Sequence, residues 1–208
     1  MKIKNAYNEW ASTYDSMSNK TRDIEANALV KTLHEVEFRN VLEIGCGTGK
    51  NTEWLARKAE KVTAVDFSEE MLKNAASKTR KENVVFIEAD VTGDWMFSEN
   101  DIDLVTCSLI LEHINDINHI FEQASSVLKS GGHFYIGELH PYRQYMGVKA
   151  RFENGDVTHE IESFIHNISD FFKAGSISGL SCVELSEWFD EENVKTLPRL
   201  ISLLYRKH

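Results

Sequence analysis

Glycines, a glutamate and two aspartates stand in this chain where they can bind a nucleoside. The segment VLEIGCGTG (41–49) joins a short apolar run, with the length of a buried strand, to three closely spaced glycines. Glycine tolerates positive φ angles and leaves the backbone open to a ligand, and a helix N-terminus with unpaired N–H groups is predicted to follow. Strand, glycine turn and helix in this order are typical of a nucleotide-binding α/β unit.

Two aspartates follow the next predicted strands. Asp66 ends the strand predicted at 62–65, and Asp90 follows the strand predicted at 84–87. Asp66 can accept both hydrogen bonds of a ribose diol, and Asp90 beside the Val91 N–H can bind an adenine edge. Either aspartate alone also fits a helix N-terminal charge or a solvated loop, so the prediction depends on finding them together.

The glycine loop and its flanks indicate the kind of nucleoside. The spacing is G-x-G-x-G with Lys50 in sixth place, which is neither the dinucleotide fingerprint nor a P-loop. Glu43 precedes the first glycine, Gly45, by two residues. A carboxylate there would repel a pyrophosphate and attract a cation. The sequence therefore favours a nucleoside that carries an ammonium or sulfonium group over NAD.

The elements that must position these residues alternate along the chain. Strands are predicted to start at residues 41, 62, 84, 103 and 133, with helical patterns between them. This spacing predicts βαβ units, and hence a parallel sheet with helices on both faces and right-handed crossovers. Ligands of such sheets bind beyond the carboxyl ends of the strands.

Both ends of the chain depart from this alternation. Residues 1–37 are predicted to be helical, with Tyr7, Trp10, Ala11 and Tyr14 on one face. Periodicity leaves open whether that face packs on the core or covers a ligand.

After residue 141 a helix starting near Ser169 is predicted to stop at Gly175 and Gly179. Strands are expected at 157–165, 181–188 and 200–205, and the last two are expected to pair as an antiparallel edge.

Composition limits the class of protein. A length of 208 residues fits one domain, and the net charge of -10 argues against a nucleic-acid backbone as partner. No apolar run reaches the length of a membrane span, and the N-terminal residues lack the apolar region of a signal peptide. Three dispersed cysteines suggest neither a disulfide framework nor a metal site. We therefore expect a cytoplasmic protein that contacts neither membrane nor nucleic acid and binds no metal.

Taken together, these segments resemble the class I S-adenosylmethionine-dependent methyltransferases, particularly the small-molecule branch. The N-terminal AYNEWASTYD (6–15) also resembles the segment that closes over the cofactor in that branch, which favours a lid for Tyr7 and Tyr14. The matching segments span nearly a hundred residues in the family's order: VLEIGCGTG (41–49), VTAVDFSEEML (62–72), FIEAD (86–90), DIDLVTCSLILEHI (101–114) and LKSGGHFYIGE (128–138).

The resemblance implies a fold and a division of the chain. The expected fold is α/β, a Rossmann-like three-layer sandwich whose seven-stranded sheet is mostly parallel, with the last strand antiparallel and inserted beside the sixth. The single domain 1–208 would consist of a helical lid (1–37), a cofactor-binding core (41–138) and an acceptor-side cover with the C-terminal antiparallel strands (139–208).

The resemblance also implies which residues bind S-adenosylmethionine. Glu43 and the glycine-loop backbone would hold the methionine part, and Asp66 the ribose. Phe67 and Met71 would flank the adenine, whose edge would face Asp90 and Val91. Ser108 and Leu109 would line the floor near the sulfonium. The full expected set is Tyr14, Glu43, Gly45, Cys46, Gly47, Gly49, Asp66, Phe67, Met71, Asp90, Val91, Ser108 and Leu109.

The acceptor side is read from residue chemistry alone. Methyl transfer needs alignment and, for a hydroxyl or protonated amine, a base near neutral pKa, for which histidine is suited. His140 is the first candidate, while Tyr7, His113, Tyr142 and Arg143 are candidates for binding a small-molecule acceptor; each of these also fits an ordinary packing role.

The sequence leaves a monomer or a homodimer open. Two alternative functions also remain: an NAD(P)-dependent oxidoreductase on a similar sheet, and a cofactor-binding protein without catalysis.

Overall fold

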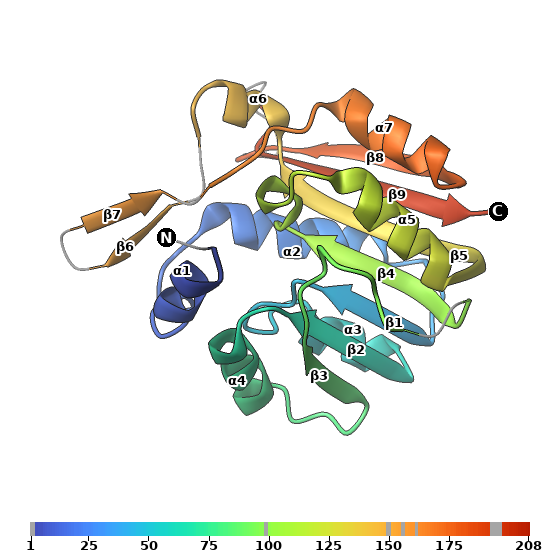
Figure 1. Cartoon of the computed structure of the whole chain (residues 1–208), viewed down its shortest axis with the longest axis horizontal. Coiled ribbons are helices and arrows are strands. Elements are labelled where there is room, and N and C mark those ends of the chain that lie inside the picture. Colours follow the sequence, from blue (N-terminus) through green and yellow to red (C-terminus); the bar gives the residue numbers. More distant parts are fainter. Residues whose placement is uncertain (1–2, 98–99, 149–150, 155–156, 161, 192–196) are drawn as a thin grey trace.

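A seven-stranded sheet forms the centre of the computed structural model, which describes all residues except 1–2, 98–99, 149–150, 155–156, 161 and 192–196 (Figure 1). The strand order is β3-β2-β1-β4-β5-β9-β8. The strands of this sheet are β1 (Asn40–Ile44), β2 (Lys61–Asp66), β3 (Val84–Glu88), β4 (Ile102–Ser108), β5 (Leu128–Leu139), β8 (Leu180–Trp188) and β9 (Leu200–Lys207).

The strand directions confirm the predicted fold class. Strands β1 to β5 pair in parallel, whereas β9 pairs antiparallel with both β5 and β8. Strand β9 is therefore the one reversed strand of this sheet, and it lies between β5 and β8. The predicted pairing of the last two strands is confirmed.

Helices cover both faces of the sheet, as Figure 1 shows. Helix α2 contacts β5 and β9, and α3 contacts β2, while α5 and α7 pack together over the other side. The helices are α1 (Ile3–Trp10), α2 (Lys20–Thr32), α3 (Thr52–Lys58), α4 (Glu69–Lys78), α5 (Ile117–Val127), α6 (Pro141–Tyr145) and α7 (Ile168–Ile177), with a 3-10 turn η1 (Leu111–His113) after β4.

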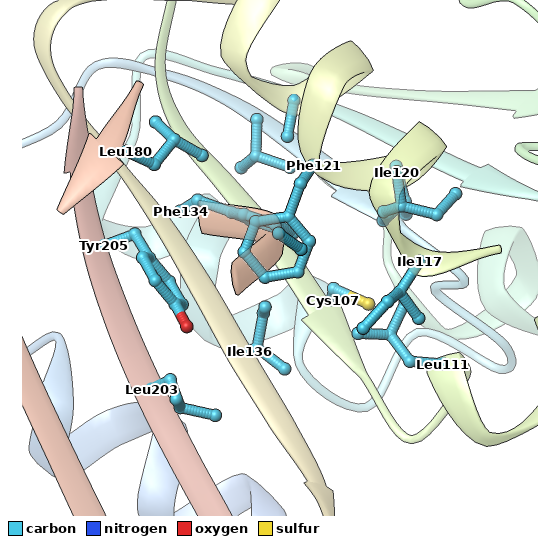
Figure 2. Packing of buried hydrophobic residues seen from close by; sticks show 14 of the residues in the cluster. Cys107, Leu111, Ile117, Ile120, Phe121, Phe134, Ile136, Leu180, Leu203 and Tyr205 are labelled. Carbon is cyan, nitrogen blue, oxygen red and sulfur yellow. The ribbon is translucent and has the colours of Figure 1, made fainter. Parts of the chain in front are cut away.

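The core follows from alternation along the strands, because successive side chains point to opposite faces. Val105 and Phe134 pack with α5 and α7, whereas their neighbours Leu104 and Tyr135 pack with α2 and α3. Phe134 and Tyr205 each meet Phe121 of α5 edge to face with ring centroids 5.2 Å apart, and they are tilted to one another at 6.5 Å (Figure 2). Two apolar layers thus fix the sheet between its helices.

The N-terminal region is not one helical stripe. Helix α1 ends at Trp10, and α2 starts only at Lys20, capped by the Asn19 side chain, which accepts the Arg22 N–H at 3.1 Å. The intervening chain turns, with the Thr13 N–H bonded to the Trp10 carbonyl. The prediction of a common helical face that reaches Tyr14 was therefore wrong.

Gly175 does not end a helix. It lies inside α7, where a Cβ would stand 2.5 Å from the Tyr205 ring, so the small residue serves close packing. The region predicted as an extra strand holds β7 (Val157–Glu160), which pairs with β6 (Arg151–Asn154) in a hairpin that extends away from the main sheet (Figure 1). Within the described residues, no helix is long and apolar enough to cross a membrane.

Candidate functional site

A cleft lies at the carboxyl ends of β1, β2 and β4. It consists of two adjoining pockets that share Gly45, Asp66, Phe67 and Ile110 in their walls. One pocket lies over the glycine loop, and the other, of about 560 Å³, lies beyond β3. The size and position fit a small-molecule site of an open α/β sheet.

The glycine loop presents its backbone to the first pocket. Gly45 and Gly47 have backbone φ angles of +69° and +53°, which residues with a side chain rarely adopt. A Cβ on Gly47 would meet no atom within 4 Å, whereas a Cβ on Gly45 would lie 2.4 Å from Ile110 Cγ2. Gly47 therefore leaves the backbone open to a ligand, and Gly45 permits Ile110 to pack directly on the loop.

Asp66 braces this loop from the end of β2. Its two carboxylate oxygens accept the N–H groups of Gly47 and Ser68, each at 2.8 Å. Each oxygen retains further accepting capacity, so the carboxylate can also meet a ligand in the cleft. Burial raises the pKa of Asp66, and the backbone N–H groups counteract that rise.

Glu43 is buried in the wall of the first pocket. Its carboxylate accepts the Thr52 hydroxyl at 2.6 Å. The pKa of Glu43 is raised to about 8. Burial is the main cause and the charges of Glu25 and Asp66 add to the rise, while the Thr52 hydrogen bond opposes it. A cation entering the pocket would favour the ionised form.

Glu25 is a second buried carboxylate of this pocket, and the sequence reasoning missed it. It accepts hydrogen bonds from Ser108 Oγ at 2.6 Å, Asn51 Nδ2 at 2.8 Å and the Tyr135 hydroxyl at 3.3 Å. These partners come from β4, the start of α3 and β5. Glu25 stands four residues before Leu29, on the buried stripe of α2, and this polar residue in an apolar stripe was the available signal.

The second pocket brings together three of the four residues predicted to surround the adenine, while the fourth, Met71, lines the first pocket. Asp90 and Val91 line it with Phe67, and Asp66 forms its border with the first pocket. Asp90 Oδ1 accepts the Thr92 N–H at 2.9 Å and the Thr92 hydroxyl at 2.6 Å.

The N-terminal segment lies over the glycine loop and α4. The Ser68 hydroxyl donates to Asn8 at 2.6 Å, the Thr48 hydroxyl donates to Asp15 at 2.7 Å, and Asn74 Nδ2 donates to the Ala11 carbonyl at 2.8 Å. These contacts tie the segment to two parts of the core. They bring both predicted lid tyrosines, Tyr7 and Tyr14, to the wall of the first pocket.

Tyr7 and His113 form a hydrogen-bonded pair at this wall. The Tyr7 hydroxyl lies 2.9 Å from His113 Nε2, and His113 Nδ1 lies 3.0 Å from the Glu162 carbonyl. A carbonyl only accepts, so Nδ1 carries the proton and Nε2 of the neutral ring accepts from Tyr7. The basic nitrogen of His113 therefore points toward the lid and the pocket.

Three predicted acceptor-side residues lie outside both pockets. His140 is fully buried, with Nδ1 accepting the Tyr142 N–H at 3.2 Å and Nε2 donating to Glu187 at 3.0 Å. Arg143 donates to Asp190 at 3.0 Å and to the carbonyls of the loop before β9. Tyr142 is half-exposed and stacks on His140. The structure thus does not bring these side chains to the cleft.

Of the other predicted residues, Gly49 lies behind the glycine loop and the rest line a pocket. Gly49, with φ of +81°, packs against Ala75 of α4 behind the loop, where a Cβ would lie 3.1 Å from Ala75 Cβ. The predicted residues that line the first pocket are Tyr7, Tyr14, Glu43, Gly45, Cys46, Gly47, Asp66, Phe67, Met71, Ser108, Leu109 and His113.

Comparison with known proteins indicates the class of protein that has this kind of cleft. Residues 42–136 match the model of the methyltransferase domain. The phosphoethanolamine N-methyltransferase of Triticum aestivum is 33% identical over 132 residues, which are 62% of this chain and 26% of that protein. The malonyl-[acyl-carrier protein] O-methyltransferase 2 of Coxiella burnetii is 31% identical over 135 residues, 63% of this chain and 54% of that protein. The chain thus spans about half, or less, of the length of these relatives.

A solved structure covers nearly the whole chain. The DhpI–SAH complex superposes with a TM-score of 0.77 at 25% identity, over 98% of this chain and 94% of that one. Residues 42–136 thus match a methyltransferase domain, and the whole chain has the fold of S-adenosylmethionine-dependent methyltransferases of known structure. The residues present fit this cofactor, because Gly47 leaves open space above the loop and the buried carboxylates Glu25, Glu43 and Asp66 line the same pocket.

Proposed function

We propose that this protein transfers a methyl group from S-adenosylmethionine to a small-molecule acceptor bound under the N-terminal lid. The observation that carries the proposal is the convergence of Glu43, the Gly47 backbone, Asp66 and Asp90 on one cleft. Two named relatives methylate small or carrier-bound molecules by their names, which supports the same class of acceptor here.

In this proposal each side chain has a binding role. Glu43 lies where it can receive the ammonium of the methionine part, Asp66 the ribose hydroxyls, and Asp90 with the Val91 N–H the adenine edge. S-adenosylmethionine supplies an activated methyl group on a sulfonium, so the protein must mainly align the acceptor and exclude water. Tyr7 and the rest of the lid exclude water from the cleft.

We propose His113, rather than His140, as the group that removes the acceptor's proton. His113 Nε2 is held in its accepting form by the Glu162 carbonyl, and it reaches the pocket through the Tyr7 hydroxyl. His140 lines neither pocket, and its Nδ1 lone pair accepts the Tyr142 backbone N–H, which cannot relay a proton as the Tyr7 hydroxyl can. A cytoplasmic location, and a monomer or homodimer, remain part of the proposal on sequence grounds alone.

Calorimetry with S-adenosylhomocysteine is the first test, followed by labelled methyl transfer to a panel of small hydroxyl, amine and carboxylate compounds. We expect binding at a single site and transfer to one compound class. Stabilisation by NAD(P) but not by S-adenosylhomocysteine would support the oxidoreductase alternative. Binding without transfer to any component of a cell extract would support the non-catalytic one.

A further inference from the structure

Glu138 is a buried carboxylate that the cofactor assignment does not use. It stands near the end of β5 with only 3% of its surface exposed. Its Oε1 accepts the N–H groups of Ile110 and Leu111, both at 2.9 Å. The side chain therefore reaches across from β5 to hold the turn that follows β4.

That turn has a backbone conformation that needs support. Leu109 has a φ angle of +57°, in the left-handed region where residues with a Cβ are uncommon. Its N–H donates to the Gly137 carbonyl at 2.8 Å, directly before Glu138 in the sequence. Residues in such conformations persist when their surroundings fix them, and they concentrate at functional sites.

The turn also shapes the cleft directly. Ile110 lines both pockets, and its Cγ2 occupies the place that a Cβ on Gly45 would need. His113 follows three residues later, at the end of η1. The position of Ile110 therefore decides how the glycine loop faces the cleft, and the position of η1 decides where His113 points.

We infer that Glu138 is a positioning residue for the cleft: its carboxyl oxygen fixes the left-handed Leu109 turn and so holds Ile110 against the glycine loop and His113 beside Tyr7. This inference rests on the proposed function of the cleft. It assigns Glu138 no contact with cofactor or acceptor, because the residue lines neither pocket.

The far side of the turn has separate anchors. The Phe164 N–H donates to the Glu112 carbonyl at 2.7 Å, and His166 Nε2 lies 2.8 Å from the Ile114 carbonyl. These contacts hold η1 from the segment before α7, and Glu138 holds its beginning. Loss of Glu138 should therefore displace Leu109 and Ile110 without releasing the whole turn.

Two conservative variants distinguish the length of the Glu138 side chain from its charge. Burial raises the pKa of Glu138 to about 8, and the charge of Glu112 adds to the rise. The carboxyl is therefore largely protonated at neutral pH, and Glu138→Gln keeps an oxygen at the same reach. Glu138→Asp keeps the carboxyl but is one methylene shorter, so it withdraws that oxygen from both N–H groups.

The test measures S-adenosylhomocysteine affinity by calorimetry and deuterium uptake of residues 109–114. We expect Glu138→Asp to weaken binding by at least about tenfold and to raise uptake in this segment, while Glu138→Gln stays within about threefold of the wild type. Ser202→Ala is the matched control, because it removes the partly buried 2.8 Å hydrogen bond that the Ser202 hydroxyl accepts from Trp188 Nε1 between β8 and β9. It should lower the melting temperature without changing affinity.

Unchanged affinity and uptake in Glu138→Asp would overturn the inference, as would a loss in Glu138→Gln equal to that in Glu138→Asp. If the wild type bound no S-adenosylhomocysteine, the proposed function would fail instead. The uptake data would still report whether Glu138 holds the turn. A variant that failed to fold would show itself by a lost thermal transition. Ile110→Ala would then test the packing of the Ile110 side chain on the glycine loop, which Glu138 is inferred to hold in place, with weaker binding expected.

Discussion

Two regions at the same edge of the sheet carry similar polar residues, but only the first brings them to the cleft over the glycine loop. The second borders a separate pocket that Arg143 and Asp190 line. The ends of β1, β2 and β4 place Glu43, Asp66 and His113 around open space. The region of α6, β8 and β9 places His140 and Arg143 in contacts with Glu187, Asp190 and nearby backbone groups. The two regions differ in what their polar side chains contact rather than in which residue types they contain.

In the first region, the Glu43 and Asp66 carboxylates keep accepting capacity beside their hydrogen bonds, and His113 is paired with Tyr7, which itself lines the pocket. In the second, ring nitrogens and guanidinium groups are satisfied by the fold. A buried polar group must be paired, so the partner distinguishes the two histidines. His140 is paired with Glu187 and a backbone N–H and serves structure, while His113 is paired with the Tyr7 hydroxyl at the pocket wall, through which a proton can pass to or from the cleft.

The two histidines give the sharpest way to break this comparison. His113→Gln should lower kcat by about 10²- to 10⁴-fold, because a positioned base is worth that much. His140→Gln should mainly lower the melting temperature, since it removes the contact with Glu187. A loss of kcat of that size in His140→Gln, with His113→Gln active, would reverse the assignment.

The glycines offer a matched pair for cofactor binding. Gly47→Val should weaken S-adenosylhomocysteine binding by about 100-fold, or about 2.7 kcal/mol, because the new side chain occupies the cleft. Gly179 also has a positive φ, of +72°, with open space at its Cβ, but it lies between α7 and β8. Gly179→Val should impose similar backbone strain with unchanged affinity by calorimetry. Equal losses of affinity would show that strain, not occupancy, is responsible.

Two aspartates at opposite ends of the sheet test the ribose role. Asp66→Ala should weaken binding by about 10- to 100-fold, the range for hydrogen bonds to a charged group. Asp103 also accepts two backbone N–H groups, from Arg39 and Asn40, but at the opposite edge of the sheet. Asp103→Ala should reduce stability alone. Calorimetry that found wild-type affinity in Asp66→Ala would exclude Asp66 from the ribose site.

The smallest expected effect concerns the ion pairs of the second region. Asp190 contacts Arg143 and Arg199, and its hydrogen bond with Arg199 lowers the pKa of Asp190 to about 2. A carboxylate whose pKa is lowered by folding stabilises the folded state above about pH 4. This contribution is lost as the pH falls toward about 2 and the carboxylate becomes protonated. Asp190→Asn should therefore lower the free energy of unfolding by about 1–2 kcal/mol at pH 7. Urea titrations should show the difference shrinking below pH 4, with affinity for S-adenosylhomocysteine unchanged throughout.

Much of the fold was predictable from local pattern. The apolar runs before Gly45, Asp66 and Asp90 became β1, β2 and β3, and the C-terminal pair became β8 and β9. The prediction failed at Gly175, where a residue typical of a helix end instead permits α7 to approach Tyr205. Close packing between distant segments leaves no local signal.

The site was predictable where strand ends carry it. Glu43, Asp66 and Asp90 follow from the rule that parallel strands end at one edge. Glu25 and Glu138 do not, because their partners lie on other elements: Ser108 and Asn51 for Glu25, the turn after β4 for Glu138.

The sequence by itself determined the order of strands and helices, the open backbone of the glycine loop and the row of carboxylates at the strand ends, because these depend on neighbours along the chain. Only the tertiary structure decided which polar side chains remain open to a ligand. It brought Tyr7 to His113 across 106 residues and joined His140 to Glu187 across 47. Residues that are distant in the sequence use each other's hydrogen-bonding groups, so the whole fold must form before it is decided whether a side chain is available to a ligand.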